Sequence, residues 1–342
     1  MLMPVPPKLL RRLLLAPLVA LLEVALLAVS PVLLVVAVVL SPVFGGLRPL
    51  RMLVIVLAGA AYHIGATLAC LGLWVASGFG RRMQTDEMQR AHYAVMRWFV
   101  GGIYRAAVRL ARVEVVFEES EATHELLSGS GRPVVLLSRH AGEGETLFVI
   151  HELLTRHSRG PRVVLHERFR LDPLMEALGE RLPNRFVDPR GGDTEVEIAA
   201  MAGELGETAA LVIFPEGRNF SPETRRRGIE RLEQAGHDKQ AQWAREMQYV
   251  SAPRPGGTLA AIEAAPGCDV VIMGHDGFPT GLKEVWELLP YPQKVEVRLW
   301  HEPASAVPSG RNEQIDWLFA WWRTLDAWVE GRRRAREHTP PV

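Results

Sequence analysis

Two long apolar runs dominate the first quarter of the chain. Glu23 is the only ionisable residue from Leu13 to Val43, and a second run extends from Met52 to roughly Gly78. As one helix, the first run would measure roughly 46 Å, more than the roughly 30 Å of a bilayer's hydrocarbon core. Pro17 and Pro31 are placed to kink or split it. The pattern predicts helices that insert into a membrane, and it is too long for a cleaved signal peptide.

Basic residues flank the two apolar runs, and both groups of basic residues are expected on the same side of a membrane. Lys8, Arg11 and Arg12 precede the first run, and Arg81 and Arg82 follow the second. Two membrane crossings satisfy this arrangement, and so does a hairpin that dips into one leaflet and returns. Burial of both runs in a soluble core is disfavoured, because a domain of this size can hardly cover them. By the positive-inside rule, we expect an anchor over residues 1–82 in the cell membrane and the remainder on the cytoplasmic face.

From residue 83 onward, short apolar runs alternate with amphipathic segments. This alternation is typical of an α/β fold with a mostly parallel sheet flanked by helices. The first segment is expected to be helical and interrupted at Gly101-Gly102. The sequence therefore predicts an α/β domain over residues 83–310, followed by a tryptophan-rich helix and a basic tail over 311–342. Strands are predicted at 113–117, 133–138, 162–165, 209–214, 269–274 and 294–300.

Composition narrows the classes of partner and site. The chain of 342 residues has 39 basic and 39 acidic residues, which argues against a nucleic-acid partner. Its two cysteines exclude a disulfide framework and disfavour a cysteine-based metal site. His151-Glu152 and His157 resemble a zinc-binding helix, but the second histidine is six residues from the first instead of four. We therefore expect no metal. Because only four of the 39 basic residues are lysine, any anion site should be built from arginine.

A histidine and an acid follow one predicted buried strand. His140 comes directly after the strand 133–138, and a glycine-rich turn leads to Glu145 at the start of the next helix. Ligand sites of open α/β sheets lie at this end of the strands. The two glycines of the turn allow the Glu145 carboxylate to reach back to one imidazole nitrogen. That contact would fix the tautomer and leave the other nitrogen as a base.

A second motif follows another predicted strand. The segment Phe214-Pro215-Glu216-Gly217-Arg218 comes at the end of the strand 209–214. Together with the His-x4-acid turn, it resembles the glycerolipid acyltransferase family, which comprises the lysophosphatidic-acid and glycerol-3-phosphate acyltransferases. The resemblance covers roughly residues 85–300. It departs from the family pattern at Glu145, where Asp is usual, and at Arg139, which is often Asn in the family.

The resemblance implies a role for each motif residue. His140 would be the general base and Glu145 the acid that orients it. The residues Glu216, Gly217 and Arg218 would line the acceptor site. The stretch 182–190 is similar to the family's phosphate-contacting block, so Arg185 or Arg190 would hold the acceptor phosphate together with Arg218.

The implied reaction is acyl transfer at a membrane. The enzyme would move a fatty acyl chain from acyl-CoA or acyl carrier protein to lysophosphatidic acid, giving phosphatidic acid. The thioester donor is a co-substrate, and no cofactor is expected because the donor is already activated. The expected partners are the lipid bilayer, the lysophospholipid acceptor and the acyl donor. Two alternatives stay open: another lysophospholipid or glycolipid acceptor, and a catalytically weak, lipid-binding member of the same fold.

Overall fold

The computed structural model describes residues 5–129, 131–142, 144–188 and 192–338. The chain forms two compact units, which are described separately. Unit 1 comprises Met1–Glu114, Leu147–Asp193 and Leu282–Gln293, and unit 2 comprises Val115–Thr146, Thr194–Gly281 and Lys294–Val342. These units are defined by packing, and the division at residues 82 and 310 stays a prediction about function.

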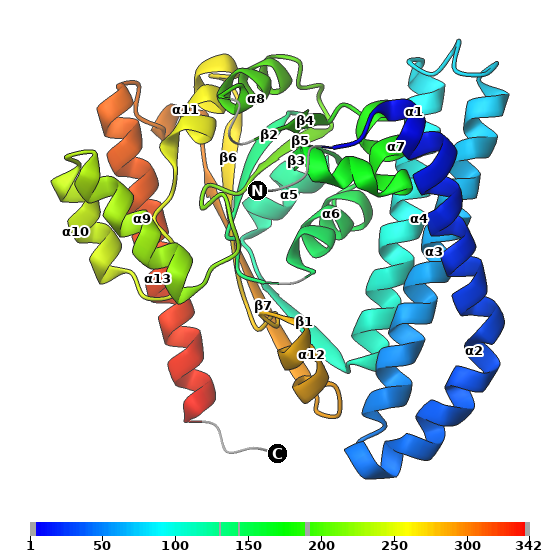
Figure 1. Cartoon of the computed structure of the whole chain (residues 1–342). Coiled ribbons are helices and arrows are strands. Elements are labelled where there is room, and N and C mark those ends of the chain that lie inside the picture. The colour runs from blue at the N-terminus through cyan, green and yellow to red at the C-terminus, as the bar shows by residue number, and fades with distance from the viewer. Residues whose placement is uncertain (1–4, 130, 143, 189–191, 339–342) are drawn as a thin grey trace. The chain divides into compact units, whose positions relative to one another are not determined.

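The α/β class predicted from the sequence is confirmed. Among the described residues there are seven strands, most of which pair in parallel, with helices flanking them (Figure 1). Unit 2 holds the order β1-β7-β6-β2-β5, and unit 1 holds the pair β3-β4. The strands are β1 (Val113–Glu118), β2 (Val134–Ser138), β3 (Gly160–His166), β4 (Arg185–Val187), β5 (Ala209–Ile213), β6 (Asp269–Asp276) and β7 (Gln293–Glu302).

The centre of the unit 2 sheet is fully buried. Strand β2 pairs in parallel with β5 and β6, and every residue of these three strands is buried. Continuous runs of Val, Leu, Ile and Ala suit strands that are covered on both faces. Strand β7 is antiparallel to β6. One of its two faces is more exposed than the other, as its alternating sequence predicts. The two candidate motifs follow β2 and β5, which are neighbours in the sheet.

The helices of unit 2 surround this sheet. They are α5 (Glu121–Gly129), α8 (Thr194–Gly203), α9 (Pro222–Gln234), α10 (Asp238–Glu246), α11 (Pro255–Ala264) and α13 (Arg311–Glu337), with the short 3₁₀ turn η3 (Ala304–Ala306). Helix α13 packs along β6 and buries Leu318, Phe319, Trp322 and Leu325. The tryptophan-rich helix is therefore part of the core.

The helices of unit 1 begin with the apolar runs. The unit contains α1 (Lys8–Leu10), the π-helical turn η1 (Arg11–Leu15), α2 (Ala16–Phe44), α3 (Arg48–Ala76), α4 (Asp86–Leu110), most of α6 (Glu145–Thr155), the 3₁₀ turn η2 (Glu167–Leu171), α7 (Pro173–Arg181) and α12 (Leu282–Leu288). The helical stretch Lys8–Phe44 is continuous, so Pro17 and Pro31 do not split it. It and Arg48–Ala76 are long and apolar enough to cross a membrane.

One helix prediction was wrong in its detail. Helix α4 runs through Gly101 and Gly102 without interruption. A Cβ atom on Gly102 would overlap the ring of Tyr62, and a Cβ atom on Gly65 would lie 2.7 Å from Trp98. These glycines therefore let α3 and α4 approach closely. The close packing offsets the conformational entropy that glycine loses inside a helix.

Candidate active site

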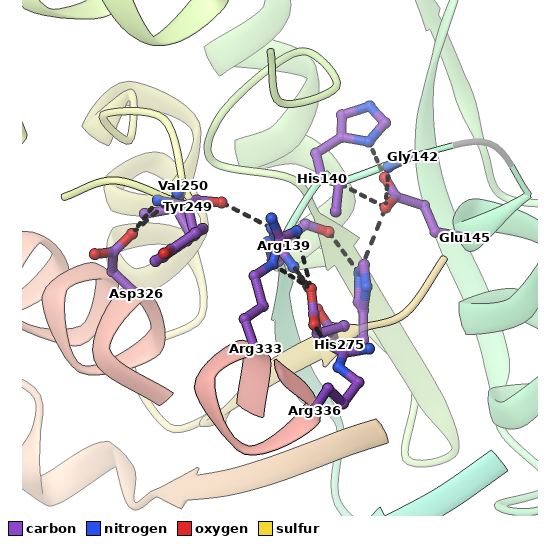
Figure 2. Close-up of polar contacts among 12 residues, drawn as sticks. Arg139, His140, Gly142, Glu145, Tyr249, Val250, His275, Asp326, Arg333 and Arg336 are labelled. Carbon is purple, nitrogen blue, oxygen red and sulfur yellow. Dashed lines mark hydrogen bonds and ion pairs between the residues drawn. The ribbon is translucent and has the colours of Figure 1, made fainter. Parts of the chain in front are cut away.

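The predicted base and its acid are in contact at the end of β2. The side chain of His140 is about one-fifth exposed, and its Nδ1 bonds to Oε1 of Glu145 (Figure 2). Because a carboxylate only accepts hydrogen bonds, Nδ1 carries the proton and donates it. The turn between them requires glycine, since a Cβ atom on Gly142 would overlap the carbonyl oxygen of Pro279. The extra methylene of Glu145, compared with Asp, is accommodated by this turn.

Glu145 is held in its ionised form although it is buried. Its Oε2 accepts hydrogen bonds from the backbone N–H groups of Ala141 at 2.5 Å and Gly142 at 2.8 Å. Burial tends to raise the pKa of this carboxyl. The hydrogen bond from His140, the electrostatic interactions with the His275 and His140 rings, and the Ala141 N–H outweigh burial and lower the pKa below its usual range. A fixed carboxylate next to an imidazole stabilises the imidazolium that forms when the imidazole takes a proton.

The orientation of His140 leaves Nε2 for a substrate. The ring packs against Phe214 with the ring centroids 4.7 Å apart. The carbonyl oxygen of His140 accepts a hydrogen bond of 2.6 Å from the N–H of Phe220, beyond the second motif. With Nδ1 committed to Glu145 and the backbone fixed, Nε2 is the atom that can accept a proton from a hydroxyl group.

Glu216 links its own loop to two other segments of unit 2, which contain His140 and Ser251. Its Oε1 accepts the backbone N–H of His140 at 3.0 Å, and its Oε2 accepts that of Ser251 at 2.8 Å. Burial raises the pKa of Glu216 to about 7, although the Arg139 charge and both N–H groups act in the opposite direction. The prediction placed Glu216 in the acceptor site, and it does line the adjoining cavity, but its oxygens bind the backbone.

An arginine-rich cavity of about 210 Å³ lies next to Glu216. It is lined by Glu216, Arg218, Thr224, Arg227, Gly228, Arg231, Ser251, Ala252 and Arg254. Burial and the charge of Arg254 lower the pKa of Arg231, and burial and the charge of Arg218 lower that of Arg254. Arg227 pairs with Glu223 at 2.6 Å. Within the described part of the chain, the other three arginines have no carboxylate partner.

Gly217 shapes the turn that places Arg218 at this cavity. Its φ is +71°, a left-handed conformation that favours glycine, and its N–H donates to the carbonyl of Phe214 at 2.9 Å. A Cβ atom at this position would lie 3.4 Å from the Arg254 side chain. The turn therefore allows the backbone of one arginine-bearing loop to pass close to the side chain of the other.

Arg185, another predicted phosphate ligand, is not among the residues that line this cavity. Arg185 begins β4 in unit 1, whereas His140 and the cavity belong to unit 2. Arg190 lies outside the described residues, so both assignments stay predictions. The sequence analysis missed Arg231 and Arg254. An uncharged stretch, residues 250–253, precedes Arg254 and the helix that follows it, and this pattern could have drawn attention to Arg254.

A buried arginine next to His140 links the loop after β2 to two other segments of unit 2. Arg139 is 1% exposed, and its guanidinium donates to the carbonyl oxygens of His275 at 2.6 Å and Tyr249 at 2.7 Å. Asp276 lies 3.3 Å from the same guanidinium and also binds Arg333 of α13 at 3.2 Å and Arg336. Burial lowers the pKa of Arg139 to about 10. The basic end of α13 is thus partly neutralised by carboxylates of unit 2.

His275 is a second histidine that sequence analysis missed. Its Nε2 lies 3.1 Å from the carbonyl oxygen of Arg139 and 3.5 Å from Oε2 of Glu145 (Figure 2). Burial lowers its pKa to about 4, so the ring is neutral at physiological pH. Because both neighbours are acceptors, Nε2 carries the hydrogen. Its signal in the sequence is weak, since a single histidine next to the end of a buried strand does not by itself indicate a site.

A comparison with known protein families gives a match to the central part of the chain. Residues 112–273 match a family model described as Acyltransferase. This range contains both motifs, Glu216 and the arginine-rich cavity, and it excludes the two apolar helices. No curated protein matches the chain. Within the described residues, no three His, Cys, Asp or Glu side chains are grouped so that they could hold a metal ion.

Proposed function

Residues 112–273 belong to the Acyltransferase family, and from this premise we propose that the protein transfers a fatty acyl chain from a thioester to the free hydroxyl of lysophosphatidic acid. The product is phosphatidic acid. The observation that carries the proposal is the His140–Glu145 pair together with Glu216, which binds the backbone N–H of His140 and also lines the arginine-rich cavity. The pair supplies the base, and the cavity supplies cations for a phosphate group.

The reaction proceeds by direct attack in this mechanism. Nε2 of His140 takes the proton of the acceptor hydroxyl as its oxygen attacks the thioester carbonyl carbon. Glu145 stabilises the imidazolium. The carbon–sulfur bond then breaks, the imidazolium returns the proton to the departing sulfur, and an ester and a free thiol result. An alcohol needs such a base because its own pKa lies far above neutral pH.

The arginine-rich cavity supports a phosphate-bearing acceptor. Arg218, Arg231 and Arg254 place three guanidinium groups around a space of about 210 Å³. Guanidinium groups bind phosphate oxygens through two hydrogen bonds at once, and such charge-assisted bonds are stronger than neutral ones. Burial lowers the pKa of Arg231 and Arg254, and repulsion from a neighbouring guanidinium lowers it further; a bound dianion would relieve that repulsion.

The proposal also places the protein at the cytoplasmic face of the cell membrane. The helices Lys8–Phe44 and Arg48–Ala76 have the length and hydropathy for membrane insertion. Basic residues at both ends of this region favour the cytoplasmic side. A lysophospholipid resides in the bilayer, so an anchored enzyme meets its acceptor there.

Thiol release by the purified protein in detergent tests the reaction. The donors are acyl-CoA and acyl carrier protein, and the acceptors are lysophosphatidic acid, lysophosphatidylcholine, a monoacylglycerol and a glycolipid. We expect release that depends on lysophosphatidic acid. A preference for another acceptor would change the substrate, and no release with any acceptor would favour the lipid-binding alternative.

The cavity is tested with Arg218→Gln and Arg254→Gln. Loss of a charge-assisted contact costs about 1.5–3 kcal/mol, so KM for lysophosphatidic acid should rise by about 10- to 100-fold. KM for monoacylglycerol should stay unchanged. Arg226→Gln is the matched control, because Arg226 lies on α9 outside the cavity and pairs with Glu223 and Glu230. Equal losses with both acceptors would show that the cavity does not bind phosphate.

A further inference from the structure

An irregular segment of unit 2 forms one side of the arginine-rich cavity. It covers residues 248–254, between α10 and α11, and is called the wall segment here. Its residues Ser251, Ala252 and Arg254 line the cavity. Val250 and Ser251 are buried, and buried backbone N–H groups need hydrogen-bond partners. Because the wall segment belongs to no described helix or strand, side chains from other parts of the chain supply these partners.

Asp326 on α13 binds three consecutive N–H groups of the wall segment. Its Oδ1 accepts hydrogen bonds from Gln248 at 3.0 Å, Tyr249 at 2.6 Å and Val250 at 3.1 Å (Figure 2). Its Oδ2 lies 3.0 Å from the same nitrogen of Gln248. Asp326 is buried, so little water competes for these bonds. One carboxylate therefore fixes the first half of the wall segment.

The second half of the wall segment binds the loop that carries the Glu216 motif. The N–H of Ser251 donates to Oε2 of Glu216 at 2.8 Å, and Oε1 of Glu216 accepts the N–H of His140 at 3.0 Å. The N–H of Arg254 donates to the carbonyl oxygen of Pro215 at 2.7 Å. A displacement of the wall segment would therefore reach the backbone of His140 through one side chain, that of Glu216.

A second route connects the wall segment to the same histidine. The carbonyl oxygen of Tyr249 accepts a 2.7 Å hydrogen bond from the guanidinium of Arg139, the residue before His140. The guanidinium of Arg333 lies over the ring of Tyr249, 4.9 Å from its centroid. Arg333 follows Asp326 by seven residues, so the two side chains share one face of α13. Both therefore hold Tyr249, which in turn binds Arg139.

Helix α13 is a rigid support that lies beyond the range matched by the family model. The match ends at residue 273, whereas α13 begins at Arg311. The neighbours of Asp326 on the helix, Leu325 and Val329, are fully buried in the core. A side chain on a helix that is fixed by packing holds its partners more precisely than one on a loop. The matched range contains His140, and part of the support for its backbone comes from outside that range.

We propose that Asp326 is a positioning residue for the base His140. It holds the wall segment, which fixes the His140 backbone through Glu216 on one side and through Arg139 on the other. The inference rests on the proposed function, in which His140 takes the proton of the acceptor hydroxyl. A displacement of about 1 Å between reacting groups can lower a rate by about 10²-fold. The effect of Asp326 is indirect and travels through the backbone.

Thiol release measures the effect of Asp326 on the rate. Asp326→Ala removes the acceptor of three N–H groups, so kcat should fall by about 10- to 100-fold with the acceptor that the wild type uses best. Asp326→Asn keeps an oxygen at the position of Oδ1, which can accept the same N–H groups. Its kcat should therefore stay within about threefold of the wild-type value.

Asp316→Ala is the matched control on the same helix. Asp316 precedes Asp326 by about 15 Å along α13, and it binds Lys239 and Gln240 of α10. Its replacement also weakens the packing of α13 against a neighbour, but it leaves the bonds to the wall segment intact. It should therefore retain full kcat. A loss of kcat that Asp316→Ala shares, or that Asp326→Asn does not restore, would overturn the proposal.

Hydrogen exchange of the same proteins, followed by mass spectrometry, separates positioning from general stability. In Asp326→Ala, the N–H groups of Ser251 and His140 should exchange at least about tenfold faster, while β2 and β5 exchange as in the wild type. Unchanged exchange at His140 would show that Asp326 supports only the wall segment and would overturn the proposal. If the wild type releases no thiol with any acceptor, the proposed function fails, and exchange at His140 alone decides whether Asp326 positions this loop.

Discussion

The two loops of the candidate site each carry a buried glutamate, and their environments act on the pKa in opposite directions. Glu145 follows β2, accepts three hydrogen bonds and has a lowered pKa. Glu216 follows the neighbouring strand β5, accepts two backbone N–H groups, and burial raises its pKa to about 7. Burial penalises both charges, so the partners decide the outcome.

The difference indicates two roles for one residue type. Glu145 contacts His140, and in the proposed mechanism its preserved charge would serve the step in which His140 becomes cationic. Glu216 touches only backbone groups of His140 and Ser251, so it fixes where the base and the cavity lie. Under the proposed function, we therefore expect Glu145 to act on the rate and Glu216 to act mainly on the structure that carries the site.

Replacement of the base should have the largest effect. His140→Ala removes the proton acceptor, so kcat for acyl transfer should fall by about 10²–10⁴-fold. The measurement is thioester-dependent thiol release with lysophosphatidic acid. His237→Ala, an exposed histidine between α9 and α10, is the control and should retain full activity. Wild-type turnover by folded His140→Ala would exclude His140 as the base.

Replacement of Glu145 should have the next largest effect on the rate. Glu145→Gln keeps the size of the side chain but removes the charge that stabilises the imidazolium, so kcat should fall by about 10²-fold. The KM values should change little, because Glu145 is buried and does not line the cavity. An unchanged kcat in a folded variant would show that the His140–Glu145 contact has no role in the reaction.

Glu216→Gln should act mainly on the pH dependence of stability. In the folded wild type the pKa of Glu216 is about 7 against an ordinary 4.5. Between these values the folded state holds a proton that the unfolded state has lost, so the free energy of unfolding falls as pH rises. This contribution amounts to about 2 kcal/mol between about pH 5 and about pH 7. The variant should lose it.

Denaturant titrations of both proteins at several pH values measure this difference. The lost hydrogen bond adds an offset that does not depend on pH, so the comparison uses the slope alone. The fall in kcat should be smaller than that of Glu145→Gln. Parallel pH profiles of stability for the wild type and the variant would contradict the raised pKa.

The sequence predicted six of the seven described strands and the His140–Glu145 contact, because these depend on local pattern; it missed β4 (Arg185–Val187), which is only three residues long. Continuous apolar runs identified β2, β5 and β6, and the five-residue spacing of His140 and Glu145 predicted their contact. In contrast, Arg254 and His275 reach the site through contacts between segments far apart in the chain, which composition cannot show. Gly101-Gly102 was interpreted as a helix break. The sequence does not show that glycine is needed at position 102 because the ring of Tyr62, on another helix, lies against it.

Substitution of His275 should have the smallest effect, and it tests the comparison of the two glutamates most selectively. The reason is that His275 lies next to Glu145 and does not bind Glu216. Burial lowers its pKa to about 4 from an ordinary 6.5. As pH falls through this window the unfolded state takes up a proton that the folded state refuses, so stability is lost toward acid, opposite to the effect of Glu216. From about pH 7 to about pH 5 the loss is about 2 kcal/mol.

Two substitutions separate the titration of His275 from its hydrogen bond. His275→Gln places an amide N–H near the position of Nε2, so it should retain kcat while its stability no longer declines toward acid as that of the wild type does. His275→Leu removes the donor that faces the Arg139 carbonyl and Glu145, so it should also lower kcat, by about tenfold. Both are measured by thiol release and by denaturant titration at several pH values. Equal kcat values for the two variants would show that the donor does not support Glu145 and that His275 serves the core alone.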